Sequence, residues 1–401
     1  MQDNESANSE GVSSEAIVDA ALDIIVRHGL SGLTLRPLAS SLGVSVAAIS
    51  TRMGAKERLI DRVVTIAARR DQHFFDRWLG LASRVDPIDP VERAALADLA
   101  FREWITAERR QATFLIELVH DRALQDAPSP PLDHWLTSAS AFWSMLLFGS
   151  PALADLALGY VLDEAGFALG AEDDPTYALL RVLCLQRFAA GLLVRTDRVD
   201  PATAIPRLIA ALEPDDLPIS TTNGPKRQRI ADSAGEIIVS QGMEAVTHRS
   251  AALAAGVPAS TVVYFFGARA ALVIAGLHAV IARFHGMRDR ARAANAAPAD
   301  DDETRDLVKA TSMIALASTR EPSLLPYAID MRRRRGENIR SSDLAWLGFD
   351  TDAGFDRAAA QVISIALFGM RMVAMARKLP ERAHYRKAFA AVEAWSAVTT
   401  R

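Results

Sequence analysis

The sequence predicts an all-α protein that contains two copies of one helical unit. Its 401 residues are 50% hydrophobic but only 6% aromatic, a composition typical of packed helices. No stretch alternates apolar and polar residues as a half-buried strand would. The segment from Ile17 to Leu59 recurs without a gap from Ile230 to Leu272, at a constant offset of 213 residues. The repeat indicates that one folded module occurs twice.

The first copy predicts three short helices and then a long one. Apolar residues recur at helical spacing from Ile17 to Ile25, Ser13 or Ser14 is a suitable N-cap, and Gly29 is a suitable stop. Thr34 and Ser45 suit the starts of the next two helices, and glycine supplies the turn between them. The expected helices cover residues 14–29, 34–42, 45–53 and about 55–81.

The second copy reads in the same way, and helical spacing continues through the rest of the chain. Its expected helices cover residues 230–241, 247–255 and 258–266, with a long helix from 268. Further helices are expected at 91–108, 112–125, 132–148, 152–169, 176–195, 202–212, 302–317, 323–331, 353–378 and 381–397.

Composition divides this helical chain into six parts. Residues 213–226 are rich in Pro, Asp, Thr, Asn and Gly and lack periodicity, so they mark the main boundary. The predicted parts are a disordered tail (1–13), a first head (14–60), a first body (61–213), a linker (214–226), a second head (227–272) and a second body (273–401).

Charge and hydropathy limit the partners. The net charge of −4 excludes a polycationic protein, yet the two repeated segments are mildly positive, as a local nucleic-acid surface requires. The acidic N-terminal tail does not resemble a signal peptide, and polar residues and Pro151 interrupt the longest apolar region, 139–160. We therefore expect a cytoplasmic protein that does not enter a membrane. The single cysteine, Cys184, is expected to be a buried, unreactive thiol.

The second and third helices of each copy have the features of a helix-turn-helix. The turn must be tight, which Gly43 and Gly256 allow, and the inward side chains must be small or aliphatic. The groove-facing side chains must be short, yet able to donate hydrogen bonds or contact thymine methyl groups. In such a motif the later helix enters the major groove of DNA.

The stretch Gly256-Val257-Pro258-Ala259-Ser260-Thr261-Val262-Val263-Tyr264-Phe265-Phe266, followed by Arg269 and Leu272, resembles the DNA-binding domain of the TetR family. The resemblance covers about 50 residues in each half and is only architectural over the bodies. It implies a three-helix head, a long fourth helix and a helical ligand-binding body. It also implies a dimeric repressor that leaves a palindromic operator when a small molecule binds.

The resemblance and the charge pattern together select candidate residues for contact with double-stranded operator DNA. In the first head these are Thr34, Arg36, Ser45, Val46, Ala47, Ala48, Ser50, Thr51, Arg52 and Lys56. In the second head they are Lys226, Arg227, Thr247, Arg249, Pro258, Ala259, Ser260, Thr261, Val263, Tyr264, Phe265 and Arg269. The cations are expected at phosphates, the alternative for Arg36 and Arg249 being an ion pair inside the head.

The two copies are unequal. Where the second has Tyr264, Phe265 and Phe266, the first has Thr51, Arg52 and Met53, so it lacks the family's aromatic cluster. We therefore expect the second head to bind DNA more strongly than the first. The rival hypothesis is a protein-interaction or ligand-sensing module whose first head no longer binds DNA. The run Arg332–Arg335 is interpreted as a solvated helix end or linker rather than an extra DNA contact.

The first body is the richer in aromatic residues and is the expected place for a small-molecule effector. Aromatic side chains on helices are usually core, but ligand pockets between helices are also mostly apolar. The candidate lining is Trp104, Phe114, His120, Trp135, Phe142, Trp143 and Tyr160, with His134 as another polar anchor. No enzyme motif, cofactor motif or metal-ligand spacing is found, so we expect a non-enzyme without cofactor or metal.

Both heads lie on one polypeptide, which removes the usual need for a second chain. A twofold dimer presents two recognition helices to successive major grooves about 34–36 Å apart. We expect the halves to pack through helices near 176–195 and 353–378 as an intrachain pseudo-dimer. A homodimer with four heads is the alternative.

Overall fold

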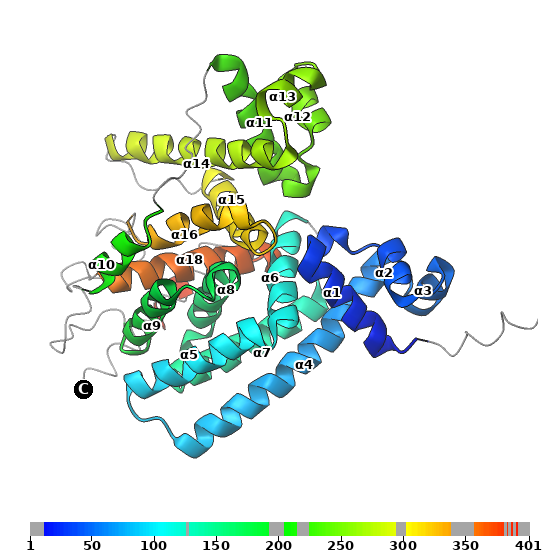
Figure 1. Ribbon diagram of the computed structural model, residues 1–401. Coiled ribbons are helices and arrows are strands. Elements are labelled where there is room, and N and C mark those ends of the chain that lie inside the picture. The colour runs from blue at the N-terminus through cyan, green and yellow to red at the C-terminus, as the bar shows by residue number, and fades with distance from the viewer. Residues whose placement is uncertain are drawn as a thin grey trace, which may run out of the picture.

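The computed structural model describes residues 12–125, 128–191, 204–214, 224–293, 302–337 and 357–380, with a few positions between 383 and 391. All regular secondary structure in these ranges is helical, which confirms the all-α class (Figure 1). Residues 1–11 of the predicted tail, most of the linker and most of the expected helix at 381–397 lie outside the described residues.

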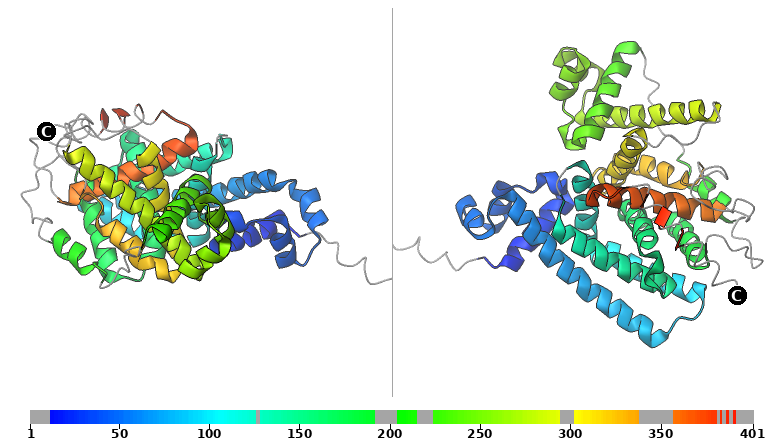
Figure 2. Two further views of the ribbon diagram at one scale, coloured as in Figure 1. Left: turned by 90° about the horizontal axis from the view of Figure 1, so that it is seen from above. Right: turned by 180° about the vertical axis from the view of Figure 1, so that it is seen from behind.

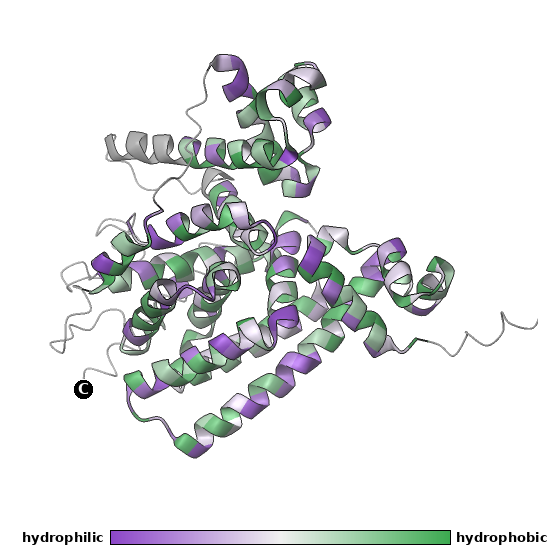
Figure 3. Ribbon diagram, in the orientation of Figure 1, coloured by the Kyte–Doolittle hydropathy of each residue, from purple (hydrophilic) through white to green (hydrophobic). Residues whose placement is uncertain are grey.

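The first half contains ten α-helices among its described residues, and their bounds follow the predicted ones closely. They are α1 (Ser14–Gly32), α2 (Leu35–Leu42), α3 (Val46–Met53), α4 (Lys56–Val85), α5 (Pro90–Thr106), α6 (Arg109–Leu124), α7 (Pro130–Phe148), α8 (Ala154–Ala171), α9 (Pro175–Ala189) and α10 (Ala204–Ala211). A short 3-10 turn, η1 (Pro151–Leu153), precedes α8. Helix α4 is amphipathic along its length, as its alternating colours show (Figure 3).

The second half repeats this order where it is described. It contains α11 (Pro225–Gln241), α12 (His248–Ala255), α13 (Ala259–Phe266), α14 (Arg269–Ala293), α15 (Asp302–Ser318), α16 (Leu325–Arg333) and α18 (Arg357–Arg377). The 3-10 turns η3 (Met243–Ala245) and η4 (Pro322–Leu324) precede α12 and α16. Both three-helix heads lie on the right of Figure 1, the second above the first, with the helical bodies to their left.

Backbone conformation explains where the helices of the heads end. The Ser13 hydroxyl accepts a hydrogen bond from the Ala16 N–H at 3.1 Å and caps α1. Gly29 has a φ of 72°, which kinks α1 instead of ending it, so the helix gains a last turn beyond the predicted stop. Its counterpart Gly242 has a φ of 88° and does end α11. A side chain at either position would be strained.

The halves pack through α18, which lies mainly against α8 and α6 and less against α9 (Figure 2). The expected contact between α9 and α18 is present, but α8 rather than α9 is the main partner of α18. The reason is close backbone approach: a Cβ atom on Gly369 would lie 1.9 Å from the carbonyl oxygen of Gly159 in α8. Helix α18 is long and apolar enough to cross a membrane, but 89% of its most apolar stretch is buried inside the protein. It is a core helix shared by both halves.

Candidate nucleic-acid interface

The turn between the second and third helices has the same hydrogen bonds in both heads. Gly43 has a φ of 65° and Gly256 a φ of 62°, the left-handed conformation that glycine adopts without strain. In the first head the Val44 N–H donates to the Ala39 carbonyl at 3.0 Å, and in the second Val257 donates to Ala252 at 3.0 Å. These bonds set the angle at which the third helix leaves the second.

The third helix of each head buries one face and leaves the other in solvent. In α3 only Ile49 and Met53 are buried, and in α13 only Val262 and Phe266. The remaining predicted contact residues of the first head are exposed: Ser45, Val46, Ala47, Ala48, Ser50, Thr51 and Arg52. In the second head Pro258, Ala259, Ser260, Val263 and Tyr264 are exposed, and Thr261 and Phe265 are half-buried. Each exposed face is available to a DNA groove.

The second head presents more apolar surface than the first. The exposed fraction is 83% for Tyr264, 49% for Val263 and 85% for Leu253 of the preceding helix. Tyr264 also packs edge-on against Phe265, with ring centroids 5.2 Å apart. A single exposed apolar side chain is ordinary, but a group on the solvent face of a third helix suits thymine methyl groups.

Arg36 and Arg249 occupy equivalent exposed places in the second helices. Neither makes an ion pair within the described parts of the chain, so the alternative of an internal ion pair is not supported. The threonines that precede them differ. Thr247 caps α12 by accepting the Ser250 N–H at 3.0 Å, whereas the exposed Thr34 makes no side-chain cap bond.

Three of the other predicted DNA-binding cations have contacts within the protein, and a fourth, Lys56, is half-buried at the start of α4. Arg269 donates to the carbonyls of Val246 and Met243 at 2.8 and 2.7 Å and pairs with Glu244 at 3.1 Å. Arg227 lies over the Phe266 ring, 5.2 Å from its centroid, and Arg52 donates to the Val12 carbonyl.

Arg269 thus stabilises the turn before α12. A DNA phosphate bound to Arg269 would compete with these three contacts. These contacts of Arg269 could not be predicted from the sequence, because the acceptors are mainly backbone carbonyls. Lys226 stays exposed in the first turn of α11, which begins at Pro225 and makes the basic segment helical.

This geometry defines a class of protein, one that presents helix-turn-helix heads on a helical body. Residues 17–63 match the family model "Bacterial regulatory proteins, tetR family". The match spans α1, α2, α3 and the first turns of α4, so the first head is similar to the DNA-binding domain of that family of transcriptional regulators. No curated protein matches the chain.

The family match lies on the head that lacks the aromatic cluster. The first head is therefore recognisable as a DNA-binding domain without Tyr264, Phe265 and Phe266 at its equivalent positions. The rival hypothesis, in which that head has given up DNA, is not favoured.

The expected effector lining of the first body is a packed core. Trp104 contacts Trp143, Phe114 contacts Trp135, and Phe142 contacts Trp143, with ring centroids 5.8, 5.8 and 4.7 Å apart. Tyr160 is also fully buried and packs on Phe188. None of these six aromatic side chains lines the cavities described below. Because these rings pack densely against one another, they fill the core and do not surround a cavity.

His120 lines two small cavities between the halves rather than a pocket formed with the predicted aromatic side chains. His120 is buried between the halves, where its Nε2 lies 3.2 Å from the Lys309 carbonyl of α15. Burial lowers the pKa of His120, so the ring is neutral and its Nε2–H donates to that carbonyl. His134 is exposed on α7.

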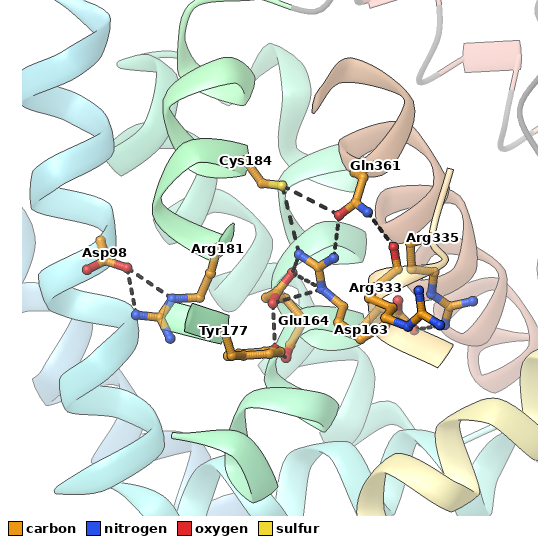
Figure 4. Close-up of polar contacts among 10 residues, drawn as sticks. Asp98, Asp163, Glu164, Tyr177, Arg181, Cys184, Arg333, Arg335 and Gln361 are labelled. Carbon is orange, nitrogen blue, oxygen red and sulfur yellow. Dashed lines mark hydrogen bonds and ion pairs between the residues drawn. The ribbon is translucent and has the colours of Figure 1, made fainter. Parts of the chain in front are cut away.

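The interpretation of Arg332–Arg335 as a solvated helix end or linker is wrong. Three of the four side chains are buried between the halves (Figure 4). Arg332, fully buried, pairs with Glu164 of α8 at 2.8 Å and donates to the Gln361 side chain at 2.6 Å. Arg335 pairs with Asp163 at 3.1 Å and lies over the Phe368 ring at 3.5 Å. Only Arg334 is exposed to a large extent.

Neighbouring groups satisfy part of this ionic cluster, whereas the buried Asp163 Oδ2 and Arg335 Nε have no hydrogen-bond partner among the described residues. The Tyr177 hydroxyl donates to Glu164 Oε1 at 2.6 Å, and Arg181 donates to Asp98 at 2.9 Å within the first half. The predicted buried thiol, Cys184, lies 3.9 Å from the Arg332 guanidinium. Burial raises the pKa of Asp163 to about 6 despite Arg335 beside it. This cluster could not be predicted from the sequence, because its acids and arginines are about 170 residues apart.

Proposed function

We propose that the chain is a sequence-specific, double-stranded-DNA-binding transcriptional regulator that works as an intrachain pseudo-dimer of two TetR-like units. It would repress its target in the cytoplasm and leave the operator when a small-molecule effector binds. The observation that carries the proposal is the pair of solvent-exposed third helices, α3 and α13, behind two identical glycine turns. The family match to the first head supports the DNA partner.

The charges at the seam between the halves support an intrachain pairing. The first half supplies the acids Asp163 and Glu164, and the second supplies Arg332 and Arg335. If equivalent surfaces of two chains met instead, acid would face acid and arginine would face arginine. Like charges in a buried interface cost several kcal/mol, on the order of 3–5 for an unpaired ion. The charges at the seam therefore favour pairing of the two halves of one chain over pairing of equivalent surfaces from two chains.

DNA binding is tested on the promoter DNA that flanks the protein's own coding region. We expect Arg36→Gln and Arg249→Gln each to weaken binding about 5- to 50-fold and to lower the salt slope by about 1, because each removes one phosphate contact. The double variant should lose about the product of the two effects. Fluorescence anisotropy over a series of salt concentrations provides the measurement.

The control is Arg84→Gln, which removes an exposed cation far along α4 from the head. Its affinity and salt slope should match the unmodified protein. If Arg36→Gln alone left both quantities unchanged while Arg249→Gln lowered them, only the second head would be bound to DNA. If neither had an effect, this docking of the second helices would be refuted.

A further inference from the structure

A cavity of about 550 Å³ opens where the two heads meet the second body. The end of α1 in the first head contributes Arg27 and His28, and the second head contributes Met243 and Glu244. The start of α14 and the segment from α15 to η4 complete its wall. In Figure 1 this place lies between the upper end of α1, the lower end of α11 and α15. Its volume lies within the range of about 300–1,000 Å³ typical of small-molecule sites.

Cationic side chains outnumber acidic ones around this cavity. Three arginines line it, Arg27, Arg269 and Arg320, against two acids, Glu244 and Glu321. Arg269 is paired with Glu244, and Arg320 with Glu117 outside the lining. Arg27 donates through Nε to the Asp23 carbonyl at 3.1 Å but makes no ion pair within the described residues. Glu321 likewise makes no ion pair among these residues and accepts a hydrogen bond from the Ser323 hydroxyl at 2.8 Å, so the lining holds one unpaired guanidinium, that of Arg27, and one unpaired carboxylate.

Part of the lining is apolar. It consists of Val273, Ile274 and Leu324, with Ala270 and Ala317 beside them. The unpaired guanidinium of Arg27 in a partly apolar cavity complements an organic anion, a molecule with one acidic group on an apolar body. We propose that this cavity is the effector site and that it takes such an anion, whose carboxylate or sulfonate pairs with Arg27.

A ligand in this cavity can affect the position of the heads, because residues of both heads line the cavity. The Glu117 carboxylate accepts the Leu30 N–H of the first head at 3.3 Å and pairs with Arg320 of the second half. Arg320 also lines the cavity and an adjoining one of about 130 Å³ that contains Glu117. An anion in the cavity would compete with Glu117 for Arg320 and so loosen the link between the first head and the second half.

This regulatory consequence rests on the proposed function, whereas the binding site itself does not. A ligand changes DNA affinity only if it binds one arrangement of the heads more tightly than another. An anion that bridges Arg27 on one head to the second half meets this condition, because its contacts exist at one spacing only.

The test uses two fluorescent probes with similar aromatic bodies. 8-Anilinonaphthalene-1-sulfonate carries a negative charge, and N-phenyl-1-naphthylamine is neutral. We expect the full-length protein to bind the anion at least 10-fold more tightly than the neutral probe. Arg27→Gln should remove that preference, and Ala270→Trp, a substitution at an exposed lining position, should weaken both probes by filling the cavity.

Arg84→Gln is the matched control and should retain the anion preference, with unchanged circular dichroism and melting temperature in every variant. Equal binding of the two probes, or an anion preference that survives Arg27→Gln, overturns the site. Fluorescence that survives Ala270→Trp shows that the probe lies elsewhere and also overturns it.

Labelled promoter DNA separates this inference from the proposed function. We expect saturating anionic probe to weaken DNA binding by the unmodified protein about 10-fold or more and to leave Arg27→Gln unaffected. Charge-selective probe binding without any DNA binding would refute the proposed function and leave the site standing. DNA binding that the bound probe does not change would refute the effector role.

Discussion

At the scale of single residues, the most perturbed acid of the first body is Asp71 on α4. It is fully buried among aromatic side chains, and the Trp135 Nε1–H donates to its Oδ2 at 2.9 Å. Burial raises the pKa of Asp71 to about 7 from its ordinary 3.8, although the bond from Trp135 opposes the shift. Protonation of Asp71 is therefore favoured in the folded protein.

Asp71→Asn should change how stability depends on pH. Because the folded pKa is raised, the contribution of Asp71 is fully present below about pH 4 and is lost as the pH rises to about 7. The loss is about 4 kcal/mol at most. We expect Asp71→Asn to be more stable than the unmodified protein by about 1–3 kcal/mol at pH 8, with the gain vanishing toward pH 4.5. Urea unfolding at pH 4.5, 6 and 8 measures it.

Asp76→Asn, an exposed change on the same helix, serves as the control. Its difference from the unmodified protein should not vary with pH between 5 and 8. A constant difference for Asp71→Asn as well would mean that Asp71 is already ionised in the folded state.

At the scale of helices, glycines decide which elements approach closely. Gly159 and Gly369 bring α8 and α18 together between the halves. In the second head Gly235 and Gly276 do the same for α11 and α14, since a Cβ on Gly235 would lie 2.8 Å from the Gly276 carbonyl oxygen. The equivalent residues of the first head are the fully buried Leu22 and Val63. That head is instead tied to α4 by ion pairs from Arg70 to Glu15 and Asp19.

Gly369→Ala should separate α8 from α18 and destabilise the protein. The new methyl group would lie 1.9 Å from a backbone oxygen that cannot move aside alone. Overpacking of this kind costs about 1–3 kcal/mol or more, far above the gain in helix propensity. The urea midpoint should fall accordingly.

The matched control is Gly166→Ala on α8, where the new methyl group would lie an ordinary 3.7 Å from Ala315 Cβ. It should be neutral or stabilise the protein by up to about 1 kcal/mol. Similar midpoints for the two variants would contradict the close crossing of α8 and α18.

At the scale of the whole molecule, the two halves share one core. Helix α18 packs on α8 and α6 of the first half, and the Glu164–Arg332 pair lies at the same seam. His120 adds a hydrogen bond across it to α15. Breaking a buried ion pair by removing one partner is costly, so this seam holds the halves in one register.

A single chain should therefore be the working unit. Multi-angle light scattering is expected to give a mass near 43.4 kDa, independent of protein concentration. A mass of about 87 kDa, twice that of one chain, would reject the single-chain pseudo-dimer in favour of a homodimer with four heads.

Local sequence determined the helices, their caps and the exposed faces of α3 and α13. These features depend on neighbours a few residues apart, so Ser45, Gly43 and the spacing of Ile49 and Met53 reveal them directly. Only the tertiary structure decided that Arg332 is buried against Glu164, that Arg269 holds a turn, and that Trp104 fills a core rather than lining a pocket. Those outcomes depend on partners brought together by long-range packing, and no local pattern of charge or hydropathy encodes which distant surface a side chain will meet.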